Sequence, residues 1–268
     1  MTSKPKSALI GHTGFVGSNL ARDIGDFEGY NSTNFRELRG QHFDLIICSG
    51  VQAVKWWANQ NPDADWAGIS ELLDVLETVT CDALILISTV DVYKSPVGVD
   101  EKTPIKLEGL HPYGLHRWRV EEFIRTHFEN NWIVRLPGLF GAGLKKNLIF
   151  DMMNNRPIDG FDARSSFQFY NLARLAKDLE AIRNSVPGTY NIAIEPVRVA
   201  DVVETITGTA YSHQTDAPPI HYDMRSHRTD VWGKSGDYIM KADEVMNDIK
   251  AFSGAAALLH KSCRGFTA

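Results

Sequence analysis

The sequence predicts an α/β protein built on a doubly wound parallel sheet, with a smaller lobe at the C-terminal end of the chain. Three observations favour this fold. A glycine-rich turn at residues 11–17 separates a short apolar run from an amphipathic helix pattern. Strand-like and helix-like segments then alternate up to Phe140, which indicates parallel strands joined by crossover helices. The run at 83–88 is almost wholly apolar, as expected when helices cover both faces of a sheet. Together these features indicate a Rossmann-like fold.

The first half of the chain supplies most of the sheet. The helix pattern at 63–80 carries its apolar residues on one stripe, and the pattern at 112–130 begins with proline, which suits a first helical turn. We expect strands at 7–10, 28–31, 43–48, 83–88 and 132–136 and helices at 15–24, 63–80 and 112–130.

Past Phe140 the alternation is looser. Two prolines in the stretch 216–222 indicate a loop that leads into an edge strand. We expect a strand at 189–193 and helices at 145–155, 171–184, 199–207 and 241–252. The chain therefore divides into a first domain at 1–140 and a smaller lobe at 141–268, which shares strands with the first domain and is not independent of it.

Composition excludes several classes of partner. The 28 Lys and Arg against 33 Asp and Glu give a net charge of −5, which offers no electrostatic case for nucleic acid or an anionic membrane. Residues 1–7 are too short and polar for a signal peptide, and no apolar run approaches the ~20 residues of a membrane span. Cys48, Cys81 and Cys263 are far apart and fit reduced thiols. We expect a cytoplasmic protein that acts on a small molecule, and a homodimer is compatible with the sequence.

The glycine turn predicts a dinucleotide site. Gly11, Gly14 and Gly17 follow one another at three-residue spacing. A side chain at Gly11 or Gly14 would hold a pyrophosphate away from the backbone N–H groups. Gly17 would let the helix lie close to the strand. A tight strand-to-helix turn without a ligand is the alternative interpretation, because glycine triplets alone are weak signals.

Further along, four segments occur in a recognisable order. The strand end at 88–93 reads Ser-Thr-Val-Asp-Val-Tyr, and the helix start at 113–117 reads Tyr-Gly-Leu-His-Arg. Residues 134–141 read Val-Arg-Leu-Pro-Gly-Leu-Phe-Gly, and residues 188–193 read Gly-Thr-Tyr-Asn-Ile-Ala. With the glycine turn, these segments resemble the extended short-chain dehydrogenase/reductase family, the NAD(P)-dependent nucleotide-sugar epimerases, dehydratases and reductases. The resemblance covers nearly the whole chain.

This resemblance implies a function and a catalytic set. It implies an NAD(P)-dependent oxidoreductase or epimerase that transfers hydride at a hydroxyl or keto carbon of a sugar or nucleotide sugar. Tyr113 matches the family's catalytic acid/base, and Thr89 matches the hydroxyl that polarises the substrate carbonyl. Arg117 stands where the family has the lysine that bonds the nicotinamide ribose and lowers the pKa of the tyrosine. Residues 1–140 then bind the dinucleotide, and residues 141–268 bind the substrate.

Arg117 is the main departure from the family pattern. A free tyrosine has a pKa near 10, so ionisation at neutral pH requires a pKa about 3 lower. A cation ~4 Å away supplies about that much at an effective dielectric of ~20. Arginine keeps the charge, but its planar fork does not copy a point-like ammonium. The alternative is therefore a catalytically silent dinucleotide-binding protein, a redox sensor or assembly partner. A nucleic-acid binder with the same fold is disfavoured by the net charge.

Two more departures bear on the reaction and the substrate. The family's dehydratases read Thr-Asp-Glu before Val-Tyr, whereas this chain has Thr89-Val90-Asp91, which counts against dehydration. Asp91 keeps one carboxylate near the substrate, and a solvated acid at a strand end is the equal alternative. Asn147 lies in a segment that resembles the part of nucleotide-sugar enzymes near the diphosphate, although a solvated helix start explains that segment as well.

The second strand favours NADP over NAD. NAD enzymes place Asp or Glu at its end to hold the adenosine ribose, whereas no carboxylate occurs from Gly29 to Arg36. Ser32, Asn34 and Arg36 suit a 2′-phosphate, with His12 as a further donor, although Arg36 is almost as well explained as a surface charge. The chain between this strand and Phe43 is short for the family, which predicts a reduced adenine pocket.

The remaining candidates complete the predicted site. No His-x-x-x-His or paired Cys/His spacing occurs, so we predict no metal. No Gly-x-Ser-x-Gly elbow occurs, which disfavours a hydrolase. The predicted catalytic residues are Thr89, Tyr113 and Arg117, and the predicted substrate residues are Asp91 and Asn147. The predicted cofactor-binding residues are Gly11, His12, Thr13, Gly14, Phe15, Val16, Gly17, Asn31, Ser32, Asn34, Arg36, Ser49, Gly50, Val51, Ser88, Tyr113, Arg117 and Pro137.

Overall fold

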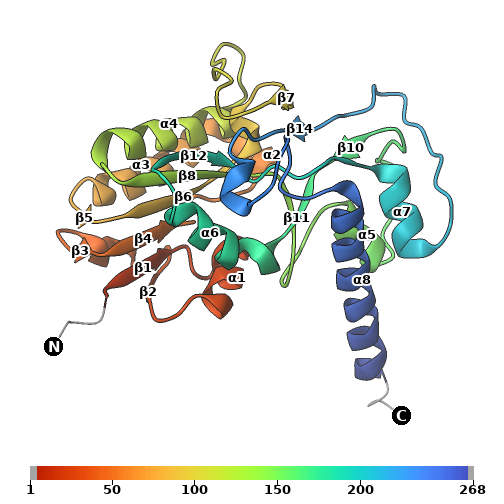
Figure 1. Cartoon of the computed structure of the whole chain (residues 1–268), viewed down its shortest axis with the longest axis horizontal. Coiled ribbons are helices and arrows are strands. Elements are labelled where there is room, and N and C mark those ends of the chain that lie inside the picture. Colours follow the sequence, from red (N-terminus) through yellow and green to blue (C-terminus); the bar gives the residue numbers. More distant parts are fainter. Residues whose placement is uncertain (1–4, 265–268) are drawn as a thin grey trace.

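A six-stranded parallel sheet forms the centre of the protein, as the sequence predicts (Figure 1). The computed structural model describes the backbone of residues 5–264 and the side chains of residues 5–255. The strands lie in the order β12-β8-β6-β4-β1-β2, and every neighbouring pair is parallel. Their bounds are β1 (Ser7–Ile10), β2 (Glu28–Tyr30), β4 (Leu45–Cys48), β6 (Leu84–Thr89), β8 (Asn131–Leu136) and β12 (Gly188–Asn191).

Helices cover both faces of this sheet (Figure 1). Helices α3 (Pro62–Leu76) and α4 (Pro112–His127) pack on one face, where Ala8 and Ile10 of β1 point. Helices α1 (Phe15–Asp23) and α6 (Leu175–Arg183) pack on the other face, where Leu9 points. Successive strand residues thus enter opposite cores, which explains why the strands are apolar on both sides.

The strand order reverses beside β1. The chain passes from β1 to β2 on one side, and then crosses to β4 on the other side of β1. Ligands of such sheets bind at the carboxyl ends of the strands at this reversal. The chain from β2 to β4 holds only the short helix η1 (Phe35–Leu38) and β3 (His42–Phe43), so the sheet ends at β2.

The second half of the chain contributes β12 to the central sheet, two small strand pairs connect it to segments of the first half, and a third pair lies within it. The parallel pairs are β9 (Gly138–Phe140) with β11 (Phe169–Asn171) and β7 (Val97–Val99) with β14 (Asp223–Met224). The antiparallel pair is β10 (Ser166–Phe167) with β13 (Val197–Arg198). The remaining elements are α2 (Lys55–Gln60), β5 (Thr80–Cys81), η2 (Val90–Val92), α5 (Leu148–Met153), η3 (Leu172–Arg174), α7 (Val199–Thr207), η4 (Thr229–Trp232) and α8 (Ala242–Arg264).

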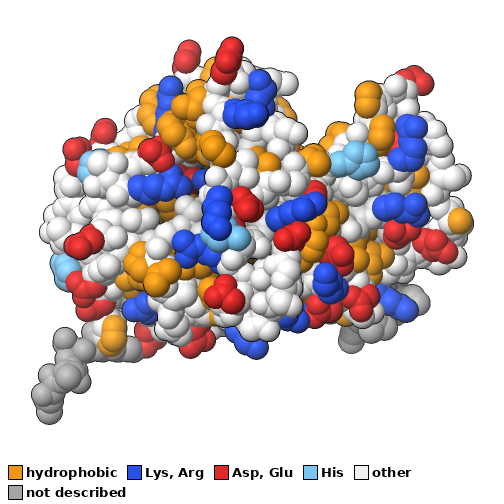
Figure 2. All heavy atoms as spheres, turned by 45° about the horizontal axis from the view of Figure 1, so that its top comes forward, with side chains coloured by type: hydrophobic (Ala, Val, Ile, Leu, Met, Phe, Trp, Pro, Cys, Tyr) orange, Lys and Arg blue, Asp and Glu red, His pale blue; other side chains and the backbone are white. Residues whose placement is uncertain are grey.

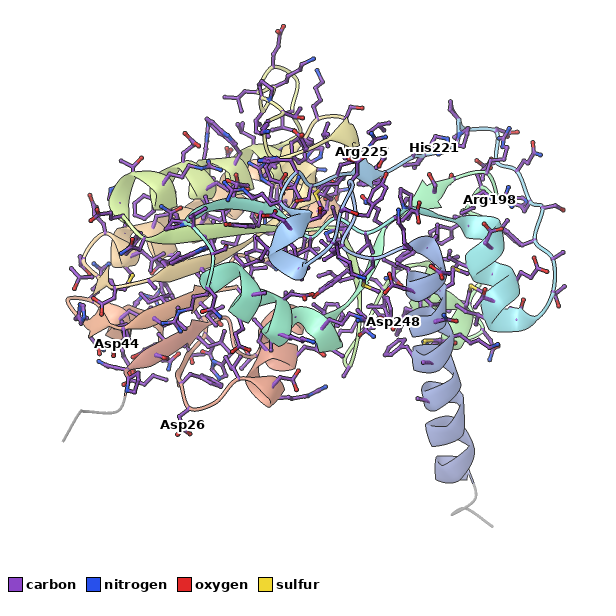
Figure 3. The ribbon with its side chains drawn as sticks, in the orientation of Figure 1. Asp26, Asp44, Arg198, His221, Arg225 and Asp248 are labelled. Atoms are coloured by element: carbon purple, nitrogen blue, oxygen red, sulfur yellow. The ribbon has the colours of Figure 1, made fainter. Side chains whose placement is uncertain are left out.

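Several predicted boundaries were wrong. The strand predicted at 43–48 is interrupted at Asp44, whose backbone N–H and carboxylate both bond the backbone of Lys6. The helix predicted at 63–80 ends at Leu76, and the segment after it forms β5, which pairs with β3. Helix α2 was not predicted. Helix α8 runs well past residue 252 and away from the body of the molecule, while an ion pair of Asp248 with Arg174 holds its first half (Figures 1 and 3).

The surface mixes charges of both signs. On the face shown in Figure 2, Lys and Arg side chains alternate with Asp and Glu, without a continuous basic stripe. Within residues 5–264, no helix combines the length and the apolar character needed to cross a bilayer. Cys48 is buried and Cys81 half-buried, and both are free thiols, whereas the side chain of Cys263 lies outside the described residues.

Candidate active site

The glycine turn lies at the point where the strand order reverses. Gly11 has a φ of 83°, and a Cβ there would lie 2.5 Å from the backbone oxygen of Ser49, at the end of β4. A Cβ at Gly17 would lie 2.1 Å from the oxygen of Gly11. Glycine is therefore required at both positions. Helix α1 begins after Gly14 with no side-chain cap and no acidic residue in its first turn, so its N–H groups suit an anion.

The predicted residues at the end of β2 are occupied by local contacts. The side chains of Asn31 and Asn34 bond backbone groups of their own turn. The ring of His12 lies against Gly29, with Nδ1 3.1 Å from the oxygen of Tyr30. The side chains of Asn31, Asn34 and His12 therefore lie together beside the glycine turn, at the carboxyl end of β2.

The guanidinium of Arg36 is engaged in an ion pair with Glu71. Its Nε donates to Glu71 Oε1 at 2.8 Å, and its guanidinium lies over the ring of Phe35. Glu71 belongs to α3, so the pair links η1 to that helix. More than half of the Arg36 side chain is exposed. Arg36 could bind a 2′-phosphate only if this ion pair opened.

Ser88 is buried, and its side chain belongs to a network of buried charges. Its hydroxyl donates to Glu121 Oε1 at 2.5 Å, and Glu121 is fully buried with Arg135, at 2.6 Å. Burial would raise the pKa of Glu121, but the positive charges of Arg135 and Arg125 and its hydrogen bonds hold that pKa below its usual value. Ser88 therefore belongs to the buried network, which is a different role from the predicted cofactor contact.

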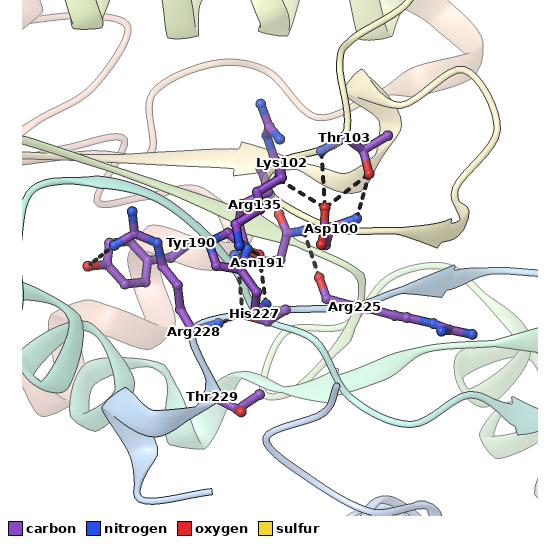
Figure 4. A network of polar contacts seen from close by, with 12 residues as sticks. Asp100, Lys102, Thr103, Arg135, Tyr190, Asn191, Arg225, His227, Arg228 and Thr229 are labelled. Atoms are coloured by element: carbon purple, nitrogen blue, oxygen red, sulfur yellow. Dashed lines mark hydrogen bonds and ion pairs between the residues drawn. The ribbon is translucent and has the colours of Figure 1, made fainter. Parts of the chain in front are cut away.

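The same network fixes the turn after β6. Arg135 Nη1 donates to the hydroxyl of Tyr93 at 2.7 Å, and Tyr93 in turn meets the buried side chain of Asn191 at the end of β12. Asn191 Nδ2 also donates to the backbone oxygen of Arg225 at 2.9 Å (Figure 4). Three strand ends and the segment after β14 are thereby held in one arrangement behind the candidate site.

The structure brings the hydroxyls of Thr89 and Tyr113 together. Thr89 ends β6, and its Oγ1 accepts from the backbone N–H of Asp91 at 3.2 Å. Tyr113 lies in the first turn of α4, and its phenol lies near enough to the Thr89 side chain for that hydroxyl to lower the pKa of Tyr113. The backbone N–H of Tyr113 donates to Asn59 Oδ1 at 3.0 Å, and His111 caps the helix start. This arrangement can hold one substrate oxygen between two hydroxyls.

Arg117 is held by a buried carboxylate. Its guanidinium donates to both oxygens of Asp65, at 2.5 and 2.9 Å, and to the backbone oxygen of Gln52. The Arg117 side chain is 5% exposed and that of Asp65 only 2%. The guanidinium also lies 3.9 Å from the ring centroid of Tyr113. Its Nε is buried without a partner, so one donor is left over.

A second cation, Lys55, also acts on the phenol of Tyr113. Lys55, at the start of α2, donates to Asp91 Oδ1 at 2.7 Å, and its Nζ is 3.5 Å from the hydroxyl of Tyr222. Tyr222 also donates to Asp91 at 3.3 Å. Lys55 is 40% exposed and Asp91 17%. Asp91 is thus an ion-paired group of the site rather than a solvated acid.

Burial, more than any neighbouring charge, sets the acidity of Tyr113. Desolvation raises the pKa of Tyr113 above its ordinary value, and the Asp91 carboxylate raises it further. The positive charges of Arg117 and Lys55 and the Thr89 hydrogen bond lower it, but they do not outweigh burial. We expected Arg117 to bring this pKa down to neutrality, and the net direction is the opposite.

Two strand ends complete the edge around the glycine turn. The Ser49 hydroxyl donates to the oxygen of Ile10 at 2.9 Å, and a Cβ at Gly50 would meet the Ile10 side chain at 2.8 Å. Val51 follows, half-buried, and Pro137 is buried at the break between β8 and β9. Thr13, Phe15, Val16 and Ser32 also border this edge of the sheet or the turn beside it. Among the described residues, no three His, Cys, Asp or Glu side chains are grouped as metal ligands.

Solved structures share this architecture. A short-chain dehydrogenase/reductase superfamily protein from Agrobacterium tumefaciens matches with a TM-score of 0.72 and 16% identity over 97% of this chain and 99% of that one. The dTDP-4-dehydrorhamnose reductase of Bacillus anthracis matches with a TM-score of 0.68 and 16% identity over 89% and 95%. The UDP-N-acetylglucosamine 4-epimerase of Methanobrevibacter ruminantium matches with 0.69 and 14% over 94% and 97%. The chain has the extended short-chain dehydrogenase/reductase fold. No family model and no curated protein sequence matches it.

Within this extended short-chain dehydrogenase/reductase fold, four residues at the site were not predicted. Lys55 and Tyr222 lie in stretches without a motif, and only the fold brings them to Asp91. Asp65 carries no signal beyond an apolar helix pattern around it. His111 precedes the Pro112-Tyr113 pair, which is the position of a helix cap and could have been found.

The predicted substrate residue Asn147 has a structural role. Its Oδ1 accepts from the backbone N–H of Phe150 at 3.0 Å and caps α5, and its Nδ2 donates to the oxygen of Leu139 at 2.9 Å. Its φ of 119° is unusual for a residue other than glycine. The helix cap and the bond to β9 occupy the side-chain groups that a diphosphate would need.

Proposed function

We propose that the chain is an NAD(P)-dependent oxidoreductase or epimerase that acts at a hydroxyl or keto carbon of a sugar or nucleotide sugar. The observation that carries the proposal is the placement of the Thr89 side chain beside the phenol of Tyr113, with the Arg117 guanidinium 3.9 Å from the ring centroid, in a fold whose glycine turn excludes side chains. Similar folds support the proposal, since the Bacillus anthracis reductase was solved with NADP and the Methanobrevibacter ruminantium epimerase with UDP-N-acetylmuramic acid.

The residues present fit a nicotinamide dinucleotide. The uncapped first turn of α1 and the glycine positions that exclude a side chain would hold the diphosphate. The unpartnered Nε of Arg117 is a donor for a ribose hydroxyl. When bound, the nicotinamide supplies or accepts the hydride. Thr89 then steadies the substrate oxygen, and Tyr113 gives a proton to that oxygen or takes one from it.

The protonation of Tyr113 bears on the direction of reaction. Because burial raises the pKa of Tyr113, the phenol is protonated at neutral pH in the ligand-free protein. A protonated phenol is the form that donates to an oxygen during carbonyl reduction. Oxidation of an alcohol requires the phenolate, so its rate rises with pH until Tyr113 is ionised.

Tyr113→Phe tests the catalytic role. We expect turnover to fall by about 10²–10⁴, because the proton path is lost, while the dinucleotide Kd measured by calorimetry stays within about twofold. Tyr211→Phe is the matched control, since the bonds of its hydroxyl within the described part of the chain go to backbone oxygens of Ile158 and Phe161. If the unchanged protein binds the dinucleotide and turns over no sugar of a broad panel, the chain is a silent binding protein and the proposal fails.

We propose further that the dinucleotide is NADP. Between Gly29 and Arg36 the end of β2 carries amide, hydroxyl and guanidinium groups and no carboxylate. Glu71 competes with the 2′-phosphate for Arg36. We therefore expect Arg36→Ala to weaken NADP(H) selectively, and Glu71→Gln to strengthen it by releasing Arg36. Calorimetric titration that finds tighter NAD(H) binding to the unchanged protein would refute this preference.

A further inference from the structure

We propose that Lys55 is a positioning residue for Tyr113: it cancels the charge of Asp91 and presents a movable cation to the phenol, which the fixed Arg117 cannot do. The inference concerns the site assigned above and rests on the proposed function for its catalytic meaning. Its physical content, the influence of Lys55 on the ionisation of Tyr113, is measurable without substrate or dinucleotide.

Three hydrogen bonds hold the guanidinium of Arg117 in one position. Asp65 accepts two hydrogen bonds from its guanidinium, and the backbone of Gln52 accepts a third. Both charged side chains are buried, so solvent cannot replace either partner. A buried pair of this kind stays closed, because separating it would leave an unpaired charge inside the protein. Arg117 therefore adds a constant field and a stacking surface to Tyr113.

Lys55 is held less firmly than Arg117, so its ammonium can change partners when a ligand binds. Its ammonium has one short bond, to Asp91, and a longer contact with Tyr222. Lys55 is 40% exposed, so water and a ligand both have access to it. It sits on α2, in the connection that leaves the end of β4, while Tyr222 comes from the second half of the chain. The pair thus bridges the two halves of the protein beside Tyr113.

Lys55 and Asp91 shift the pKa of Tyr113 in opposite directions. Asn59, which shares α2 with Lys55, accepts from the backbone N–H of Tyr113 at 3.0 Å. The backbone oxygen of Asp91 lies against Gly114, the residue after Tyr113. From these positions the positive charge of Lys55 favours the phenolate, and the negative charge of Asp91 disfavours it. Removing Lys55 therefore acts twice, because it takes away a cation and leaves Asp91 without its partner. Both changes raise the pKa of Tyr113. A change of 1 in the pKa corresponds to about 1.4 kcal/mol of difference in interaction between the two protonation states.

The groups that surround Tyr113 come from α2, α3, α4 and η2 and from the segments just before α4 and β14. Arg117 shares α4 with it, His111 precedes that helix, and Asp65 of α3 reaches it only through Arg117. The charged or titratable groups facing the phenol are Arg117, Lys55, Asp91, His111 and, through Lys55 and Asp91, Tyr222. Only Lys55 and Asp91 form a half-exposed ion pair among them.

The experiment is a pH titration of Tyr113 in protein labelled with fluorotyrosine, followed by ¹⁹F NMR. Fluorination lowers the intrinsic pKa of every tyrosine and therefore moves the titration to lower pH. Tyr113→Phe assigns the resonance. We expect Lys55→Met to raise the pKa of Tyr113 by about 1, Lys55→Arg to leave it near its original value, and Asp91→Asn to lower it. Lys94→Met is the control, because among the described residues that exposed lysine bonds the backbone of Glu108 and no group of the site.

The pKa measurements test the role of Lys55 independently of whether the protein turns over a sugar. A raised pKa in Lys55→Met that Lys55→Arg restores supports the inference, whether or not any sugar is turned over. A pKa that stays within 0.2 of the original overturns it, even if the protein is an active enzyme. If Lys55→Met does not fold, Asp91→Asn decides, because an unchanged or higher pKa in that variant contradicts the inference. In an active enzyme, the alkaline limb of kcat/KM moves to higher pH in Lys55→Met and returns in Lys55→Arg.

Discussion

Two ion pairs flank Tyr113, and they differ in almost every physical respect. Arg117 and Asp65 are buried, joined by two hydrogen bonds, and closed off by the backbone of Gln52. Lys55 and Asp91 are joined by one bond and are partly exposed to solvent. The buried pair can fix the position of the tyrosine ring, whereas the exposed pair can exchange partners when a ligand enters. The effect of a cation on Tyr113 therefore depends on how firmly the cation is held as well as on its distance from the phenol.

Breaking the buried pair should have the largest effect. Asp65→Ala leaves Arg117 charged and unpaired inside the protein and also removes the partner of His116. We expect the free energy of unfolding to fall by about 3–5 kcal/mol, measured by urea denaturation. Asp74→Ala, at an exposed position of the same helix, should change it by no more than about 0.5 kcal/mol. Equal losses in the two variants would contradict the account of the buried pair.

Arg117→Lys should have an intermediate effect. A lysine cannot make the two-pronged contact with Asp65 and also reach the oxygen of Gln52, so we expect a loss of about 1–3 kcal/mol in urea denaturation. Turnover should be preserved or raised if Arg117 does the work of the family's lysine. Dinucleotide binding without turnover in both proteins would indicate a retired site and favour the silent binding protein.

Breaking the exposed pair should have the smallest effect on stability. Asp91→Asn removes a charge whose partner is 40% exposed, so the free energy of unfolding should change by less than about 1 kcal/mol. The alkaline limb of the pH–rate profile should move to lower pH, because the carboxylate raises the pKa of Tyr113. A stability loss above about 2 kcal/mol would mean that this pair is structural, like the buried one.

The sequence was sufficient for the sheet and the glycine turn because both depend on local patterns. Apolar runs and the spacing of Gly11, Gly14 and Gly17 follow from steric and burial rules that act within a few residues. The interruption at Asp44 was not predictable in this way, since it depends on a contact with Lys6 of a separate segment. Helix α2 lacks the length and the apolar stripe that make a helix visible in a sequence.

The site was predictable only where a motif marks it. Thr89, Tyr113 and Arg117 lie in motifs, but their partners come from distant parts of the chain. Asp65 is 52 residues from Arg117, and Tyr222 is 131 residues from Asp91. No periodicity links such residues, so the pairing that decides how each charge behaves required the fold.

The measurement that tests the central claim most directly is a crystal structure of the protein soaked with NADPH and a panel of nucleotide sugars. The account predicts density for the dinucleotide along the glycine turn, with the nicotinamide beside Thr89 and Tyr113. Arg117 should keep both bonds to Asp65, and Lys55 should face the sugar. Absence of the dinucleotide, or a nicotinamide bound by an Arg117 that has left Asp65, would contradict the account.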